Sequence, residues 1–277
     1  MIFETLQVKQ DGAVLFAAIS APPMNLLGSD LVQDLVSLIQ QAEADETIRV
    51  IVFSSADPDY FISHVDVTRI GEYREAAVKL AGEPSLGLLF RYFSASRLIT
   101  VAQIEGRVRG AGSEFVLACD MRFAARETAI FAQPEAGLGL LPGAGGMQHL
   151  TRLMGRARAL EVILSADDYT AELAEHYGWI NRALPAAQLE GVVHSLAHRI
   201  AGFPAGAQAM IKDIVNSIAL GSAEEFRRDS AFFSELAANR EVQGRMQAGF
   251  RRGFQTRDAE KALGRLLGEL TPAPRRG

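Results

Sequence analysis

Two glutamates in apolar, glycine-rich surroundings offer the clearest chemistry in this sequence. Within residues 106–146, Glu114 follows the small-residue turn 110–113, and Glu135 follows a Gln-Pro turn 21 positions further on. Two carboxyl groups whose surroundings push their pKa values apart can act as a general acid and a general base. The pair therefore predicts proton-transfer chemistry in an apolar cleft.

Each glutamate also has a plain structural explanation when it is taken alone. Small residues can simply permit close packing, and Glu114 in the first turn of a helix would complement the helix dipole. Glu135 by itself would be a solvated turn residue. Their occurrence in one segment favours the catalytic interpretation.

The turn 110–113 directly precedes an apolar run that predicts a helix. The first backbone amides of such a helix point outward and can bind an anion or an oxyanion. Glu114 would stand on the first turn of the same helix. It would then lie within reach of whatever group these amides polarise.

The elements that must position these residues follow from the hydrophobic periodicity. Residues 3–9 and 13–19 predict a β-hairpin around Asp11-Gly12, and a helix over 31–44 is expected to be capped at Ser29-Asp30. Runs typical of buried parallel strands occupy 48–55 and 99–106. This strand, helix, strand order predicts an α/β fold.

The segment 57–96 is too long for a simple connection, so helices that cover a cleft are expected there. Most of the chain after Gly146 has helical periodicity, and 179–185 predicts a short strand. The composition of 271–277 predicts a disordered tail.

Length and composition restrict the class of protein. A chain of 277 residues that is 48% hydrophobic can bury one full core, with an appended helical extension. The net charge of -5 argues against a nucleic-acid partner. The lone Cys119 excludes an internal disulfide and a multi-thiolate metal site. Neither a signal peptide nor a membrane-spanning run is apparent, so a cytoplasmic protein without a membrane partner is expected.

The motif order resembles the crotonase superfamily, the enoyl-CoA hydratases and isomerases. GAGSE, F-x-QPE and LGLLPGAGG carry the resemblance, which extends over about residues 3–265. It implies a crotonase-like spiral of ββα units over 1–200 and a C-terminal helical region, 201–270, that builds homotrimers or dimers of trimers. It also implies an acyl-CoA thioester substrate, with coenzyme A as part of the substrate and no separate cofactor or metal.

The resemblance assigns roles to individual positions. In the family, two glutamates share a water: one removes its proton as it attacks the β-carbon, and the other supplies a proton to the α-carbon. Glu114 and Glu135 match these two glutamates, and the backbone amides of Val65 and Ala111 match the oxyanion hole. The positions matched to substrate binding are Ser63, His64, Asp66, Gly110 and Gly143.

Two departures from the family pattern lie at the oxyanion hole. The family usually has Gly-Ala where this chain has His64-Val65, and glycine where it has Ala111. His64 could hydrogen-bond substrate or Asp66, although a structural role is favoured.

A further pair of residues, Arg107 and Arg109, is unusual for the family. These cations could lower the pKa of Glu114 or receive a carboxylate on the substrate. Placement at the surface is the alternative.

Hydration is favoured over double-bond isomerisation because the simple isomerases of the family need only the glutamate that matches Glu135. Dienoyl-CoA isomerases carry an added carboxylate at the position of Gly143. Isomerisation and a non-catalytic acyl-CoA-binding oligomer remain open alternatives. The walls of the acyl pocket are expected from residues 65–95.

One other motif resembles a metal site. His194 and His198 stand at i and i+4, so one helix face could present both rings to a metal ion. The surrounding sequence offers no obvious third ligand, and a solvated helix face is therefore expected.

Overall fold

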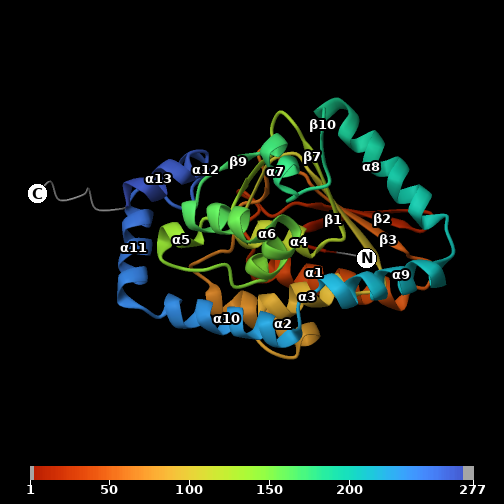
Figure 1. The fold of residues 1–277 in the computed structure, drawn as a ribbon, viewed down its shortest axis with the longest axis horizontal. Coiled ribbons are helices and arrows are strands. Elements are labelled where there is room, and N and C mark those ends of the chain that lie inside the picture. The colour runs from red at the N-terminus through yellow and green to blue at the C-terminus, as the bar shows by residue number, and fades with distance from the viewer. Residues whose placement is uncertain (1–2, 271–277) are drawn as a thin grey trace, which may run out of the picture.

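The computed structural model describes residues 3–270, and the tail predicted to be disordered, 271–277, lies outside them. The described strands form two sheets that are surrounded by helices (Figure 1). In spatial order, the six-stranded sheet contains β1 (Leu6–Asp11), β2 (Val14–Ile19), β3 (Val50–Ser55), β5 (Ile99–Ile104), β7 (Met121–Ala125) and β10 (Arg182–Leu184). The four-stranded sheet contains β4 (Tyr60–Ile62), β6 (Arg107–Arg109), β8 (Ile130–Ala132) and β9 (Tyr169–Thr170).

The helices divide into those between the strands and those that follow them. The first group contains α1 (Ser29–Ala44), α2 (Ile70–Ala81), α3 (Leu86–Ala95), α4 (Ala111–Ala118), α5 (Glu135–Leu138), α6 (Gly146–Ser165) and α7 (Ala171–Tyr177). The second contains α8 (Ala186–Ala201), α9 (Ala205–Ala219), α10 (Ala223–Ala237), α11 (Arg240–Arg251), α12 (Arg257–Glu260) and α13 (Leu263–Glu269).

From β3 to β8, consecutive strands alternate between the two sheets. β3, β5 and β7 lie side by side in the large sheet, and the strands that follow them, β4, β6 and β8, lie side by side in the small one. The pairs β3–β5, β5–β7, β4–β6 and β6–β8 are parallel, and each two-strand unit leads into one or two helices. This repetition confirms the α/β class and the predicted spiral of ββα units.

The N-terminal hairpin is confirmed, since β1 and β2 pair antiparallel with Asp11 opposite Val14. The helices predicted within 57–96 are present as α2 and α3. The predicted cap of α1 is wrong, because Ser29 is already helical and Gly28 precedes the helix. The Ser29 hydroxyl donates to the carboxylate of Asp30 instead of capping.

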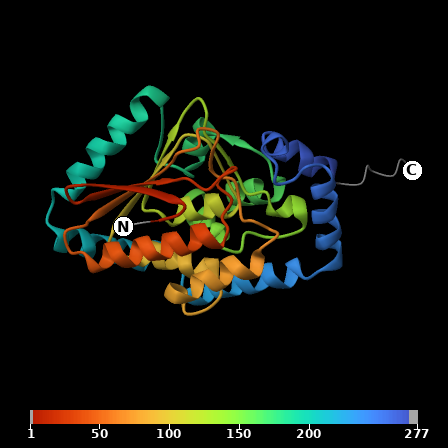
Figure 2. The same ribbon diagram turned by 180° about the vertical axis from the view of Figure 1, so that it is seen from behind.

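The core lies on both faces of the large sheet. Helices α1 to α4 cover one face, where Phe115 makes edge-to-face contacts with Phe53, Phe90 and Phe93 at centroid distances of 5.0, 5.6 and 5.7 Å. Helix α8 covers the opposite face, on which Leu189 and Val193 pack with apolar strand residues. Figures 1 and 2 show the sheet between α8 and α1.

The C-terminal helices pack against helices from the middle of the sequence. Helix α10 packs along α3, while α11 and α13 contact α5 (Figure 1). The division predicted at residue 200 stays a prediction, although residues beyond it form part of the cavity described below. None of the helices within residues 3–270 combines the length and apolar character needed to cross a membrane.

The start of α4 lies unusually close to β4. A Cβ atom added at Gly112 would lie 2.3 Å from the carbonyl oxygen of Ile62. Backbone atoms cannot yield cheaply, so a residue without a side chain is required at this position. The approach fixes where the first amides of α4 lie.

We expect Gly112→Ala to lower the free energy of unfolding by about 1–3 kcal/mol, as overpacking does in a dense interior. The matched control is Gly191→Ala within α8, where the described residues leave the space open and the helix should gain up to about 1 kcal/mol. Thermal unfolding followed by circular dichroism measures both. Equal melting temperatures for the two variants would contradict the steric argument.

Candidate active site

One cavity brings together the four principal residues predicted from the sequence. Glu114 and Glu135 line it, together with Val65 and Ala111. They come from α4, α5 and the segment between β4 and α2. The walls are largely apolar, and their main members are Val67, Leu86, Leu138, Leu140, Phe233 and Phe254. The cavity is therefore an apolar site that contains two carboxyl groups.

Glu114 stands on the first turn of α4 and is 2% exposed. Its Oε1 accepts hydrogen bonds from the amides of Ala144, at 2.7 Å, and Gly146, at 2.8 Å. Burial raises the pKa of this carboxyl to about 7, while the two amides oppose the shift by stabilising the charged form. Glu114 can therefore exchange a proton near neutral pH.

Glu135 is the first residue of α5 and is 8% exposed. Its buried Oε2 has no hydrogen-bond partner among residues 3–270. Burial and, next, the charge of Glu114 raise the pKa of Glu135 well above its ordinary value. The surroundings thus favour protonated Glu135 beside an ionisable Glu114, which is the separation that acid–base catalysis requires.

Gly110 makes room for this arrangement without lining the cavity. A Cβ atom at this position would lie 3.0 Å from Oε1 of Glu135 and 3.3 Å from Cβ of His64. Its φ of 51° also favours glycine. The small-residue turn is therefore a spatial requirement of the site.

The amides of Val65 and Ala111 are hydrogen-bond donors at the cavity. Val65 forms an isolated bridge with Leu27, in which Leu27 bonds to the carbonyl of His64 and the amide of Asp66. The N–H of Val65 is left without an acceptor among the described residues, as is that of Ala111 at the start of α4. Such unpaired donors can stabilise an oxygen that develops negative charge.

His64 lines the cavity, but both of its ring nitrogens have protein partners. Nδ1 lies 2.7 Å from the carbonyl oxygen of Val65, and Nε2 lies 3.1 Å from Oε1 of Glu260. The ring also stacks on Phe254 at 4.9 Å. This geometry favours the structural role and leaves neither nitrogen for a substrate.

Asp66, the alternative partner considered for His64, does not bond to its ring. Asp66 instead accepts from the backbone N–H and hydroxyl of Thr68, because it begins a turn that leads into α2, and from the side-chain Nε2 of Gln255. Burial opposes ionisation of Glu260, but His64, the Gln255 amide and Arg109 hold the pKa of that carboxyl below its ordinary value.

The two arginines of β6 do not serve Glu114. Arg109 is fully buried and binds both carboxylate oxygens of Asp168, at 2.7 and 2.6 Å, and the carbonyl of Glu260, at 2.7 Å. The guanidinium of Arg107 lies 5.7 Å from the ring centroid of Tyr60. The alternative in which these cations lower the Glu114 pKa is wrong, since burial raises that pKa and neither arginine contributes to the shift. Surface placement is wrong for Arg109, because its guanidinium is buried between the carboxylate of Asp168 and the carbonyl of Glu260.

The remaining predicted substrate contacts differ in position. Ser63 is buried outside the cavity lining, and its hydroxyl donates to the carbonyl of Met24 at 2.5 Å. Asp66 also lies outside the lining, whereas Gly143 is part of it. A Cβ atom at Gly143 would lie 2.5 Å from Cβ of Phe233, so glycine lets α10 approach the site.

Val67, Tyr73 and Leu86 of the segment 65–95 line the cavity, and their contact with an acyl chain stays a prediction. The sequence did not reveal the opposite wall, to which Phe233 and Phe254 contribute. Phe233 has the helical spacing of an ordinary packing residue. A local pattern therefore contains no signal that would place it beside residues a hundred positions earlier.

Comparison with known proteins relates the chain to one family. The family model described as enoyl-CoA hydratase/isomerase matches residues 9–257. A probable enoyl-CoA hydratase of Rhizobium meliloti is 31% identical over 250 residues, which cover 90% of this chain and 95% of that protein. The short-chain-enoyl-CoA hydratase of Clostridium acetobutylicum is 28% identical over 211 residues, which cover 76% of this chain and 80% of that protein.

Solved structures agree over nearly the whole length. A crystal structure from Streptomyces avermitilis, of a protein assigned as an enoyl-CoA hydratase, is 49% identical, has a TM-score of 0.95 and covers 98% of each chain. Pseudomonas aeruginosa DspI is 28% identical with a TM-score of 0.70, covering 84% of this chain and 96% of that one.

The raised pKa of Glu114 predicts a pH-dependent stability. An unfolded chain loses this proton near pH 4.5 and the folded chain near pH 7, so rising pH destabilises the fold between these values, on the order of 3 kcal/mol. Glu114→Gln keeps an oxygen for both amides and removes the ionisation. The quantity to compare is the melting temperature of the variant minus that of the unaltered protein. We expect this difference to be larger at pH 8 than at pH 5.

The control for this measurement is Glu175→Gln at an exposed position of α7. Differential scanning fluorimetry at both pH values compares the three proteins. If Glu114→Gln and Glu175→Gln follow the same pH dependence, burial does not govern the ionisation of Glu114.

Proposed function

Because this chain belongs to the enoyl-CoA hydratase/isomerase family, whose members are enzymes, we propose that it is an enoyl-CoA hydratase. The reaction adds water across the 2,3 double bond of an enoyl-CoA thioester. The observation that carries the proposal is the pair of buried carboxyl groups, with unequal environments, in a cavity also lined by Val65 and Ala111, whose amides are unpaired within residues 3–270.

The two glutamates divide the proton transfers. Ionised Glu114 removes a proton from water as the water oxygen bonds to the β-carbon of the substrate. The π electrons of the double bond shift towards the α-carbon and the thioester oxygen. Protonated Glu135 then gives its proton to the α-carbon, which leaves Glu114 protonated and Glu135 ionised until solvent exchange restores both.

Glu114 suits the role of base because two amides hold its Oε1 and the described residues form no hydrogen bond to Oε2. Glu135 suits the role of acid because its surroundings favour the protonated form. Positioned proton transfer of this kind contributes about 10²–10⁴-fold in rate. Water and protons are the only groups transferred, so the proposal includes neither a separate cofactor nor a metal in the site.

The amides of Val65 and Ala111 are proposed to bind the thioester oxygen as negative charge develops on it. Loss of one such donor costs about 2.7–4 kcal/mol of transition-state stabilisation in hydrolases. Since the donors are backbone groups, side-chain substitutions there need not remove them. The apolar wall formed by Val67, Leu86 and Phe233 would contact the acyl chain.

We also propose that the chain forms homotrimers, which can pair as dimers of trimers. Helix α9 presents a row of apolar side chains that are more than half exposed in the isolated chain: Met210, Ile211, Ile214, Val215 and Ile218. An apolar helix face of this kind is typical of a subunit interface.

The assignment of the glutamates predicts that Glu135→Gln and Glu114→Gln each lower hydration of crotonyl-CoA by about 10²–10⁴-fold. Hydration is measured by the loss of enoyl-thioester absorbance, with Glu175→Gln as the control. Undiminished hydration by Glu135→Gln would overturn the mechanism. Isomerisation of a 3-enoyl-CoA that persists in Glu114→Gln would identify an isomerase, and tight acyl-CoA binding without turnover would identify a binding protein.

The two roles also predict a bell-shaped pH dependence of kcat/KM. Activity should rise through about pH 7 as Glu114 ionises, and fall at higher pH as Glu135 loses the proton that it must donate. Initial rates with crotonyl-CoA from pH 5 to 10 give the profile. A rate that is constant across pH 7 would contradict Glu114 as the base.

A further inference from the structure

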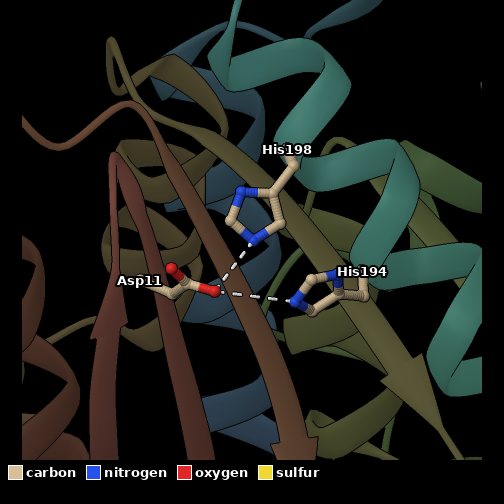
Figure 3. Close-up of side chains that lie close together, drawn as sticks. All are labelled: Asp11, His194 and His198. Atoms are coloured by element: carbon tan, nitrogen blue, oxygen red, sulfur yellow. Dashed lines mark ion pairs between the residues drawn. The ribbon is translucent and has the colours of Figure 1, made fainter.

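The fold places a carboxylate beside the histidine pair of α8. Asp11 stands at the turn end of β1. It faces His194 and His198, which stand on the neighbouring helix α8 (Figure 3). Oδ2 of Asp11 lies 3.7 Å from Nε2 of His194 and 3.3 Å from Nε2 of His198. None of these three residues lines the active-site cavity.

These spacings, which also allow ion pairs, are compatible with a shared metal ion. One ligand atom from each of the three residues lies within 4.8 Å of the others. A tetrahedral Zn²⁺ with bonds of about 2.0–2.1 Å holds its ligand atoms about 3.3–3.4 Å apart. The distance from Asp11 to His198 matches this edge length, and the distance to His194 is slightly longer, so the side chains would have to move closer together to complete the geometry.

Hydrogen bonding does not already account for the cluster. Nε2 of His198 is shielded from solvent and has no hydrogen-bond partner among the described residues, although Asp11 is near. The contact from His194 is longer than a hydrogen bond. A buried ring nitrogen without a partner calls for an explanation, and a shared ion supplies one.

The two rings are held in place by packing. Phe16 of β2 stacks on His194 with centroids 5.4 Å apart and an interplanar angle of 13°, and it also contacts His198 at 6.1 Å. Glu190, one turn before His194, lines the same hollow as Asp11 and adds a further carboxylate nearby. Lys9 also lines this hollow, and its positive charge would disfavour the binding of a metal cation.

We propose that Asp11, His194 and His198 bind a divalent transition metal of the Zn²⁺ class and thereby fasten α8 to the N-terminal hairpin. Two imidazoles and one carboxylate suit Zn²⁺, Ni²⁺ or Cu²⁺, whereas Mg²⁺ and Ca²⁺ prefer oxygen ligands. Solvent completes the coordination, because these side chains are between 33% and 55% exposed. The site is structural and independent of the proposed hydration.

Isothermal titration of the full chain with ZnCl₂ tests the site, using protein that lacks a polyhistidine tag and has been treated with a chelator. We expect one Zn²⁺ per chain at this site and a melting temperature that rises with Zn²⁺ concentration. MgCl₂ at the same concentrations should leave the melting temperature unchanged.

His194→Ala, His198→Ala and Asp11→Asn should each weaken Zn²⁺ binding about 10-fold or more. Loss of a residue that only hydrogen-bonds to a metal ligand already has an effect of about this size, and loss of the ligand itself should cost at least as much. The matched control is His176→Ala, another exposed histidine, which should bind as the unaltered protein does. Circular dichroism without metal verifies that each variant is folded.

Two outcomes would overturn the proposal. One is that the unaltered chain shows no Zn²⁺-dependent rise in melting temperature at concentrations up to about 1 mM, where even weak binding is detectable. The other is that the double variant His194→Ala/His198→Ala binds Zn²⁺ with unchanged affinity, which would place the ion elsewhere. Crotonyl-CoA hydration by the metal-free chain separates this test from that of the proposed function.

Discussion

Burial of Glu114 against two backbone amides is the interaction on which the rest of this structure depends. A carboxylate inside an apolar site is costly unless hydrogen bonds stabilise it, and the amides of Ala144 and Gly146 supply them. Burial still dominates, so the pKa rises to about 7. The loop before α6 must therefore turn its backbone towards α4. Glu135 shares the cavity with Glu114, and its pKa is the more strongly raised of the two.

Close backbone approach is the second requirement, and glycines satisfy it. Gly112 brings α4 against β4, Gly110 leaves space beside Glu135, and Gly143 admits α10. These contacts place the amides of Val65 and Ala111, which have no acceptor in the described part of the chain, at the same cavity as the carboxyl groups. The chemistry thus depends on positions where a side chain is absent as much as on the two glutamates.

The C-terminal segment completes the site from the opposite side. Glu260 binds His64, and its carbonyl accepts a hydrogen bond from the buried guanidinium of Arg109. Phe254 stacks on the imidazole. Buried charges are tolerated only when they are paired and hydrogen-bonded, and Arg109 meets this condition through Asp168. The departure from the family at His64 is therefore coupled to a packed C-terminal contact.

The sequence by itself determined the glutamate pair and the hairpin, because these are recorded in local spacing and periodicity. The family and its ββα order followed from the resemblance of the sequence motifs to known proteins. The tertiary structure alone decided which distant groups meet. Glu260 is 196 positions from its partner His64, and Asp168 is 59 positions from Arg109. The same holds for Asp11 beside the histidines of α8. Periodicity indicates which face of an element is buried, but the partner on the other side is chosen by the packing of the whole chain.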